Sequence, residues 1–226
     1  MPTCASICVY HSGIETGMDT MNVKRIFCIG RNYAKHIEEL GNANDGDCVI
    51  FMKPASCVVD EGETVILPSA FGEVHHEAEL VVLLTGGGRD IAVEDAMDCV
   101  AGITLGLDLT LRDLQTRLKN KGAPWELAKA FDNAAPLGDF KPYLEQDLQA
   151  LEFTCHVNGE LRQHGFTKNM LYSVARQIHI LSQTWELQPG DAIYTGTPEG
   201  VGPVKPGDTI LLQSPQIGRF QWSFSA

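Results

Sequence analysis

The sequence predicts a strand-rich α+β fold, a mixed β-roll or sandwich. Short runs rich in valine and isoleucine recur along the chain, and turn-forming residues separate them, which is the pattern of strands. Two stretches have the spacing of an amphipathic helix, and they do not alternate regularly with the strands. A doubly wound parallel sheet requires that alternation, so we expect a mixed sheet instead.

Seven strands are expected from these runs. In chain order they are Arg25–Ile29, Val49–Met52, Val74–Leu84, Gly102–Leu107, Glu152–Val157, Ala192–Thr195 and Thr209–Gln213. Gly86-Gly87-Gly88 lacks the lysine and hydroxyl residue of a phosphate-binding loop, and we interpret it as a hairpin turn.

Two helices are expected, each from one apolar stripe. The first stripe consists of Leu111, Leu114 and Leu118. Thr110 is placed to cap this helix. The second stripe consists of Met170, Val174, Ile178 and Leu181.

The chain has 226 residues, of which 44% are hydrophobic and 20% charged, an ordinary globular composition. The first strong strand signal begins at Arg25, so we divide the chain into a lead-in over residues 1–24 and one catalytic domain over residues 25–226. Met1–Val23 has no continuous apolar core, so it does not resemble a signal peptide. The longest apolar run, Leu80–Leu84, is far shorter than a membrane helix.

The chain is acidic, with 17 basic and 29 acidic residues and a net charge of −12. Such a charge repels nucleic-acid phosphates and anionic lipids, which argues against both as partners. An anionic substrate would need a local positive charge, and a bound metal ion is the obvious source.

The seven cysteines are scattered and form no CxxC pair. This pattern excludes a disulfide scaffold and argues against a zinc–thiolate site. Free thiols are typical of a reducing cytoplasm, where we expect the protein to be located.

Two glutamates stand in the most apolar of the expected strands. Residues two apart on a strand point to the same face, so Glu77 and Glu79 would be neighbours, with His75 next to them. An exposed edge strand is one interpretation of this segment. The apolar run that follows favours burial instead, and two buried carboxylates side by side need a compensating cation.

Asp108 stands where an apolar strand passes into a helix. By itself it can be a helix-start residue that accepts hydrogen bonds from backbone N–H groups. Together with Glu77 and Glu79 it completes three hard oxygen ligands, which favour Mg²⁺ or Mn²⁺ over zinc. His75 and His76 could also bind a metal, although packing or a nearby hydrogen bond is the simpler explanation for both rings.

His36 and Glu39 are three residues apart and would meet on one face of a helical turn. A glutamate that orients and charges a histidine makes a general base near neutral pH. An exposed turn with an ordinary local pair is the alternative, because such contacts are common.

Several cationic and polar residues could hold an anionic substrate. They are Lys53, Arg112, Gln115, Lys129 and Thr197. Any one of them could be an ordinary surface residue. Lys129 is the least suited to full exposure, because it stands between alanines near Trp125 and Phe131, and a partly buried lysine requires an anion.

In this order, these segments resemble the signature blocks of the fumarylacetoacetate hydrolase superfamily. The matching segments are Gly30-Arg31-Asn32-Tyr33 with His36, His75-His76-Glu77 with Glu79-Leu80, Leu107-Asp108 with Thr110, Arg112-Asp113 and Gln115, Lys121-Gly122 with Pro124-Trp125 and Lys129, and Thr195-Gly196-Thr197-Pro198 with Gly200-Val201-Gly202-Pro203. Within the superfamily, the chain is most similar to the short single-domain branch of acylpyruvases and oxaloacetate decarboxylases.

The resemblance implies the mixed β-roll of this family's C-terminal domain, a homodimer, and Mg²⁺ or Mn²⁺ bound by Glu77, Glu79 and Asp108. It also implies that His36 and Glu39 form a dyad on a mobile lid segment. We assign catalytic roles to His36, Glu39 and Lys129, and substrate binding to Lys53, Arg112, Gln115 and Thr197.

The function expected from the resemblance is metal-dependent hydrolysis of a C–C bond in 2,4-diketo acids such as acylpyruvate or fumarylpyruvate. The small anionic 2-oxo acid would release pyruvate through its enolate, with the metal as Lewis acid. His36 would take a proton from the attacking water, and Lys129 would stabilise the developing oxyanion.

Other functions remain open at this point. The same arrangement could decarboxylate or tautomerise oxaloacetate, or act on longer 2-oxo dicarboxylates from aromatic catabolism as a decarboxylase or isomerase. Arg31 and Lys35 could then supply a cation for the distal carboxylate. A metal-stabilised binding protein is the alternative outside the enzymes, and the presence together of His36, Glu39 and Lys129 argues against it.

Overall fold

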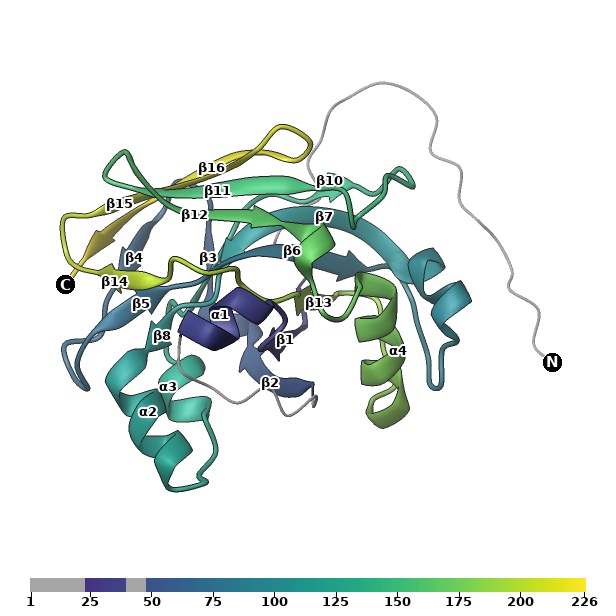
Figure 1. Cartoon of the computed structure of the whole chain (residues 1–226), viewed down its shortest axis with the longest axis horizontal. Coiled ribbons are helices and arrows are strands. Elements are labelled where there is room, and N and C mark those ends of the chain that lie inside the picture. The colour runs from purple at the N-terminus through teal and green to yellow at the C-terminus, as the bar shows by residue number, and fades with distance from the viewer. Residues whose placement is uncertain (1–22, 40–47) are drawn as a thin grey trace.

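The computed structural model describes residues 23–39 and 48–226, so the expected lead-in over residues 1–24 lies almost entirely outside the described residues. The described chain forms a curled eight-stranded sheet, a five-stranded sheet packed against it and a small three-stranded sheet (Figure 1). This architecture confirms the predicted strand-rich α+β fold. Within the described ranges, no helix has the length and apolar character needed to cross a membrane.

Three sheets contain all the strands of the described ranges. The eight-stranded sheet consists of β1 (Arg25–Gly30), β2 (Val49–Pro54), β3 (Val58–Asp60), β6 (Ala78–Leu84), β7 (Val100–Leu107), β9 (Ala135–Leu137), β10 (Lys141–Pro142) and β13 (Asp191–Tyr194). The five-stranded sheet consists of β4 (Thr64–Ile66), β11 (Glu152–Val157), β12 (Glu160–Phe166), β15 (Thr209–Ser214) and β16 (Gly218–Ser225). The three-stranded sheet consists of β5 (Val74–His76), β8 (Thr110–Leu111) and β14 (Gly202–Val204).

The strand order is non-sequential, as a mixed sheet requires. The large sheet has the order β2-β1-β13-β6-β7-β9-β3, with β10 paired to β7. Most neighbours are antiparallel, but β1 runs parallel to β13 and β3 runs parallel to β9. The five-stranded sheet has the order β12-β11-β15-β16-β4, and the small one has the order β14-β5-β8.

The helices are short, and most connections between strands in the described ranges contain no α-helix. The α-helices are α1 (Ala34–Glu39), α2 (Arg112–Asn120), α3 (Glu126–Lys129) and α4 (Val174–Thr184). The 3₁₀ turns are η2 (Ala55–Cys57), η3 (Val93–Cys99) and η4 (Thr167–Asn169). In Figure 1, α2 and α3 lie side by side, and α4 lies apart from them.

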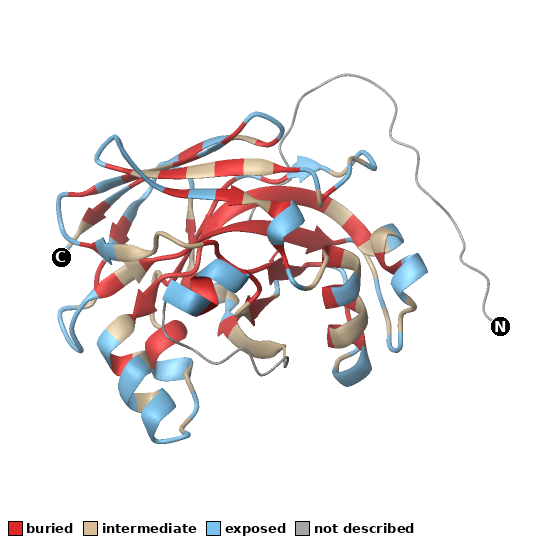
Figure 2. Ribbon diagram, viewed as in Figure 1, coloured by how far each residue is buried: buried red, intermediate tan, exposed pale blue. Residues whose placement is uncertain are grey.

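Strand β6 is buried on both faces. All seven of its residues are buried, and Figure 2 shows β6 and β7 as the most continuously buried part of the large sheet. Leu80 and Val82 belong to one apolar cluster, whereas Val81 and Leu83 belong to a second one on the opposite face. This alternation follows from the two-residue repeat of a strand. It rules out the exposed edge strand that the sequence had left open.

The expectations for the strand that contains β6 and for the start of α2 were wrong. The single strand expected over Val74–Leu84 is interrupted at Glu77, which separates β5 in the small sheet from β6 in the large one. Thr110 does not cap α2, because it belongs to β8 and its hydroxyl donates to the carbonyl oxygen of Asp108 at 3.1 Å. The helix begins instead after Leu111, with no side-chain cap.

The second apolar stripe also starts earlier than its helix. Met170 precedes α4, and Ser173 caps the helix by accepting a hydrogen bond from the backbone N–H of Arg176. Val174, Ile178 and Leu181 face the core as the stripe predicted.

The packing beneath the end of β7 gives a first testable prediction. A β-carbon placed on Gly106 would lie 2.8 Å from the hydroxyl of Tyr194 and 3.0 Å from the carbonyl oxygen of Pro136. We therefore expect Gly106→Ala to lower the free energy of unfolding by about 1–3 kcal/mol, because overpacked cores must shift. Urea unfolding would measure the loss.

Gly86→Ala is the matched control, because a β-carbon there meets nothing within 4 Å. It should leave the unfolding midpoint essentially unchanged. A Gly106→Ala protein as stable as the wild type would show that the strand junction is less tightly packed than the contacts indicate.

Candidate metal centre and active-site pocket

Three carboxylates converge where β6 begins and β7 ends. Glu77 occupies the break before β6, Glu79 is the second residue of β6, and Asp108 directly follows β7. The strands are antiparallel, with Glu79 opposite Gly106, and the N–H of Asp108 extends the pairing by donating to the carbonyl oxygen of Glu77 at 2.9 Å. One oxygen from each carboxylate lies within 4.8 Å of the others.

The three carboxylates, here called the acidic triad, are almost completely buried. Their exposed fractions are 4% for Glu77, 2% for Glu79 and 1% for Asp108. Buried carboxylates so close to one another repel strongly unless cations compensate them.

Three cationic side chains from three different elements provide part of this compensation. Lys129, at the end of α3, places its Nζ 2.7 Å from Oε2 of Glu77 and 2.6 Å from Oδ2 of Asp108. Lys53, from β2, lies 2.8 Å from Oδ1 of Asp108. Arg112, the first residue of α2, forms an ion pair with Oε1 of Glu77 and donates to Oε1 of Gln115 at 2.7 Å.

The surroundings shift the pKa values of Glu77 and Glu79 in opposite directions. Burial alone would raise the pKa of Glu77, but the charges of Lys129 and Arg112 hold the pKa well below its ordinary value. Burial and the neighbouring charge of Asp108 raise the pKa of Glu79 well above its ordinary value. Burial would lower the pKa of Lys129, yet Asp108 and Glu77 raise it, so this lysine stays an ammonium group.

Glu79 is therefore the triad member with the greatest need for a further cation. Its Oε2 accepts a hydrogen bond from the backbone N–H of Gly196 at 2.7 Å, whereas the ion pairs described above involve Glu77 and Asp108. A divalent cation between the three carboxylates would offset the repulsion at Glu79, and hard carboxylate oxygens suit Mg²⁺ or Mn²⁺. The residues present fit such an ion.

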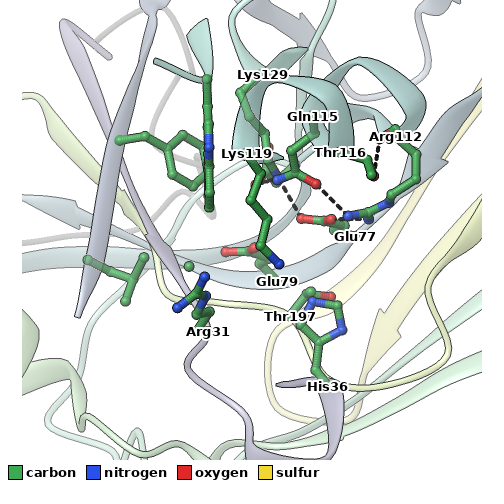
Figure 3. Close-up of a pocket in the computed structure, with 15 residues that line it drawn as sticks. Arg31, His36, Glu77, Glu79, Arg112, Gln115, Thr116, Lys119, Lys129 and Thr197 are labelled. Carbon is green, nitrogen blue, oxygen red and sulfur yellow. Dashed lines mark hydrogen bonds and ion pairs between the residues drawn. The ribbon is translucent and has the colours of Figure 1, made fainter. Parts of the chain in front are cut away.

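The His36–Glu39 pair forms on α1 as the spacing predicted. Nδ1 of His36 lies 3.3 Å from Oε2 of Glu39. Glu39 also accepts hydrogen bonds from the backbone N–H of Gly200 at 3.0 and 3.3 Å, which ties α1 to the loop after β13. His36 is 6% exposed, whereas Glu39 and most of α1 are exposed, so only the histidine of the pair is enclosed. Figure 3 shows its ring directed across the pocket toward Glu77.

The loop after β13 forms hydrogen bonds to the strand segment that carries Glu77 and Glu79. Thr197 donates from its hydroxyl to the carbonyl oxygen of Ala78 at 2.9 Å, next to Glu77 and Glu79. Gly196 adopts a φ of 105°, and a β-carbon there would lie 2.6 Å from Cβ of Asn32. Glycine is therefore required for the N–H of residue 196 to reach Glu79.

One pocket collects most of the predicted site residues (Figure 3). Those that line it are His36, Glu77, Glu79, Asp108, Arg112, Gln115, Lys129 and Thr197. Glu39 stands behind His36 and does not line the pocket. Lys53 does not line it either: it is 1% exposed and donates to the carbonyl oxygens of Leu109 and Lys129. We had expected Lys53 to contact the substrate directly. In the structure it forms an ion pair with Asp108 behind the pocket wall instead.

Gln163, which the sequence gave no reason to select, organises the floor of the site. Its Oε1 faces Nδ1 of His76 at 3.0 Å and accepts from the N–H of Ala78 at 3.0 Å. Its Nε2 donates to the hydroxyl of Thr197 at 2.8 Å and to the carbonyl oxygen of Pro198 at 2.9 Å. His76 thus takes part in a buried hydrogen-bond network beneath the triad.

Two further cations, Arg31 and Lys119, line the pocket. We had considered Arg31 as a contact for a second carboxylate but had not chosen it, and Lys119 was missed. Lys119 is exposed on α2, and a charged residue on the polar side of a helix carries no sequence signal of its own.

The fold and the site together define a class of protein, a strand-rich domain whose curled sheet carries a carboxylate centre suited to a divalent cation. The family model described as fumarylacetoacetate (FAA) hydrolase C-terminal matches residues 25–224, and the chain belongs to this family of enzymes. The resemblance inferred from the signature blocks is therefore confirmed.

Named relatives carry out different reactions. The chain is 44% identical to oxaloacetate tautomerase YcgM of Escherichia coli (strain K12) over 192 residues, 84% of this chain and 88% of the relative. It is 42% identical to the mitochondrial oxaloacetate decarboxylase of Dictyostelium discoideum over 189 residues, 83% of this chain and 87% of the relative. The chain also resembles a solved structure, that of fumarylpyruvate hydrolase from Pseudomonas aeruginosa in complex with Mn²⁺ and pyruvate. The two share 39% sequence identity with a TM-score of 0.86, and the match covers 90% of each chain.

The triad yields a prediction about cation binding. With Mg²⁺ or Mn²⁺ at about 100 times its dissociation constant, the wild-type protein should gain roughly 2.7 kcal/mol of stability. Glu79→Gln should lose this gain, because it removes one of the three ligands. Without the cation it should be at least as stable as the wild type, because the repulsion from Asp108 is gone. Thermal unfolding with and without the cation measures both effects.

Glu73→Gln is the control, because Glu73 has a 65% exposed side chain and lies outside the triad. It should keep the full stabilisation by the cation. If Glu79→Gln kept it as well, the triad would not be the binding site.

A further prediction concerns Gln163. Gln163→Leu would leave several buried donors and acceptors without partners, so we expect a loss of about 2–4 kcal/mol in the free energy of unfolding. Gln213→Leu, at an exposed position of β15, should cost far less. Equal effects of the two substitutions in urea unfolding would contradict the supporting role of the buried network.

Proposed function

We propose that the protein is a divalent-cation-dependent enzyme that interconverts the keto and enol forms of oxaloacetate. The observation that carries the proposal is that His36, held by Glu39, lines the same pocket as the acidic triad. This combination supplies a proton-transfer group beside a centre for a cation. The 44% identity to an oxaloacetate tautomerase supports this reaction over the C–C bond hydrolysis that we had expected first.

Glu77, Glu79 and Asp108 would hold the cation. When bound, Mg²⁺ or Mn²⁺ would act as a Lewis acid that polarises the 2-oxo group of the substrate and favours its enolate. The choice between the two ions is open to direct measurement.

His36 would move the proton. Its Nδ1 faces Glu39 at 3.3 Å, so Nε2 is the atom available for exchange with the substrate. Nε2 would take a proton from C3 of the keto form and deliver it to the oxygen on C2, and the reverse reaction uses the same path. The carbon and oxygen are only two bonds apart, so one base serves both ends.

Lys129, Arg112 and Gln115 would hold the charge and position of the substrate. The ammonium group of Lys129 lies between two triad carboxylates and stays protonated, so it can stabilise negative charge that develops at the oxygen on C2. Arg112 and Gln115 are joined by a hydrogen bond and line one wall of the pocket, where they can orient a carboxylate.

Hydrolysis of a C–C bond in 2,4-diketo acids is the second candidate. The dyad of His36 and Glu39 favours it, because activation of a water molecule requires a base of this kind. The similarity to the fumarylpyruvate hydrolase structure supports it at the level of the family. Decarboxylation of oxaloacetate would use the same polarised 2-oxo group and no attacking water.

The experiment that tests the proposal follows three signals with chelator-treated protein, with and without Mg²⁺. These are the ultraviolet absorbance of enol-oxaloacetate, pyruvate release from oxaloacetate and pyruvate release from acetylpyruvate. We expect cation-dependent loss of the enol signal faster than pyruvate release. Pyruvate release that keeps pace with enol loss would assign the decarboxylase, and release from acetylpyruvate alone would assign the hydrolase.

The role of His36 is tested by substitution. His36→Ala should slow the enol–keto conversion by roughly 10²–10⁴-fold, as expected for loss of a general acid–base group, and should leave stabilisation by Mg²⁺ intact. His164→Ala is the control, because His164 is exposed and lies on β12 away from the pocket. A His36→Ala enzyme with normal turnover would remove His36 from the mechanism.

A further inference from the structure

His75 lies in β5 beside the acidic triad without belonging to it. Among the described residues, the group placed to hold a metal ion contains the three carboxylates and not His75. The pairing of β5 with β8 sets His75 opposite Thr110, which precedes Arg112 by two residues. The side chain of His75 is 17% exposed, so its ring is largely enclosed, and the polar atoms of an enclosed ring need partners.

Both ring nitrogens of His75 have such partners. Nε of Arg112 donates to Nδ1 of His75 at 3.4 Å, and Nε2 of His75 lies 3.4 Å from Oε2 of Glu73. A guanidinium group has no acceptor, so Nδ1 must carry the lone pair and Nε2 the hydrogen. His75 is therefore a ring in a fixed tautomer, which accepts from Arg112 on one side and donates to Glu73 on the other.

The guanidinium of Arg112 is held by three different side chains. Its Nε donates to His75, its Nη1 donates to Oε1 of Gln115 at 2.7 Å, and its Nη2 donates to Oε1 of Glu77. Figure 3 shows Arg112 with its head group beside Glu77 and Gln115. A planar group with a partner on each of its three nitrogens cannot turn without losing a hydrogen bond, so its orientation is fixed.

The contact from His75 completes this arrangement at the Nε side. Arg112 lines the pocket and His75 does not, so His75 can act on a bound molecule only through Arg112. A guanidinium has five N–H groups, and three contacts do not exhaust the donors that an anion can use. Without the acceptor at Nε, the group could tilt about its contact with Glu77, and its remaining N–H groups would be less well aimed.

We propose that His75 is a positioning residue, which orients the guanidinium of Arg112 toward the carboxylate of a bound 2-oxo acid. This role rests on the proposed function, because it takes Arg112 as a contact for the substrate. It also gives a purpose to a histidine that the sequence left open as a metal ligand or a packed ring.

Pyruvate binding tests the role of His75, because pyruvate carries the 2-oxo carboxylate end and requires no turnover. The full chain with saturating Mg²⁺ is titrated with pyruvate, and tryptophan fluorescence reports binding through Trp125, which lines the pocket. His75→Leu should weaken pyruvate binding roughly three- to tenfold, the range expected for one hydrogen bond. His75→Asn should bind within about twofold of the wild type, because its Oδ1 can replace Nδ1 as acceptor.

A double-mutant cycle separates positioning from a general structural effect. Arg112→Gln should itself weaken pyruvate binding, and adding His75→Leu to it should cause little further loss, because the residue through which His75 acts is gone. In enol–keto conversion, His75→Leu should raise KM by the same factor as the dissociation constant of pyruvate and leave kcat nearly unchanged.

His164→Leu is the matched control. His164 also contacts a glutamate, with Nε2 lying 2.6 Å from Oε1 of Glu152, but it is exposed and lies outside the pocket. This variant should bind pyruvate as the wild type does. Thermal unfolding with and without Mg²⁺ shows whether each variant is folded and keeps its cation centre. If His75→Leu does not fold, His75→Phe takes its place, because it keeps a ring and removes the acceptor.

Several outcomes would overturn the positioning role. These are a wild-type protein that does not bind pyruvate, unchanged affinity in His75→Leu, a His75→Asn protein that binds as weakly as His75→Leu, additive losses in the cycle, and loss of stabilisation by Mg²⁺ in the His75 variants. The proposed reaction is judged separately, by enol–keto conversion in the wild type. Affinity for pyruvate that depends on His75 in a protein without this conversion would keep the positioning role and reject the tautomerase.

Discussion

The burial of three carboxylates at the junction of β6 and β7 is the constraint on which the rest of the site depends. Glu77, Glu79 and Asp108 are brought together by the pairing of the two strands, and they cannot stay ionised there without cations. Lys53 from β2, together with Lys129 and Arg112 from the two helices after β8, supplies three. β2, α2 and α3 must therefore lie where their cationic side chains reach the triad.

The three cations do not compensate every carboxylate of the triad. The three cations contact Glu77 and Asp108, while Glu79 is held by the backbone of Gly196. The centre thus combines an acidic core, which suits a divalent ion, with cations at its walls, which suit an anionic substrate. This resolves the difficulty raised by the net charge of −12: the overall field repels anions, but the pocket concentrates positive charge where an anion would bind.

The sequence predicted the parts of the site that have short-range causes. Glu77 and Glu79 were recognisable because carboxylates in an apolar strand are costly, and the His36–Glu39 contact follows from helical spacing alone. The break in the strand at Glu77 was not predictable from its apolar pattern, because β5 and β6 join different sheets and only tertiary pairing separates them. The burial of β6 was predictable from its continuous apolar run, and the core face of α4 from the helical period of its apolar stripe.

The residues that the sequence missed act through long-range contacts. Gln163 reaches His76 and Thr197 from 87 and 34 residues away, and nothing near it in the sequence marks a buried glutamine. Lys53 looked like a substrate contact because its surroundings give no sign that it would be enclosed behind Asp108. Contacts between residues far apart in the sequence form only in the folded chain. Sequence patterns therefore reveal the reactive side chains of a site more readily than the residues that hold them in place.

The connection between Glu39 and Gly200 bears on which reaction the pocket favours. This contact joins α1 to the loop that also carries Gly196 and Thr197, so the same loop contacts both the His36–Glu39 pair and the triad strand. Proton exchange between neighbouring atoms of one substrate needs only this closed arrangement. Hydrolysis needs, in addition, a water molecule held between His36 and a distal carbonyl group. With Ile37 buried beside it, His36 lines the same pocket as the triad, and the proposed tautomerisation depends on this arrangement.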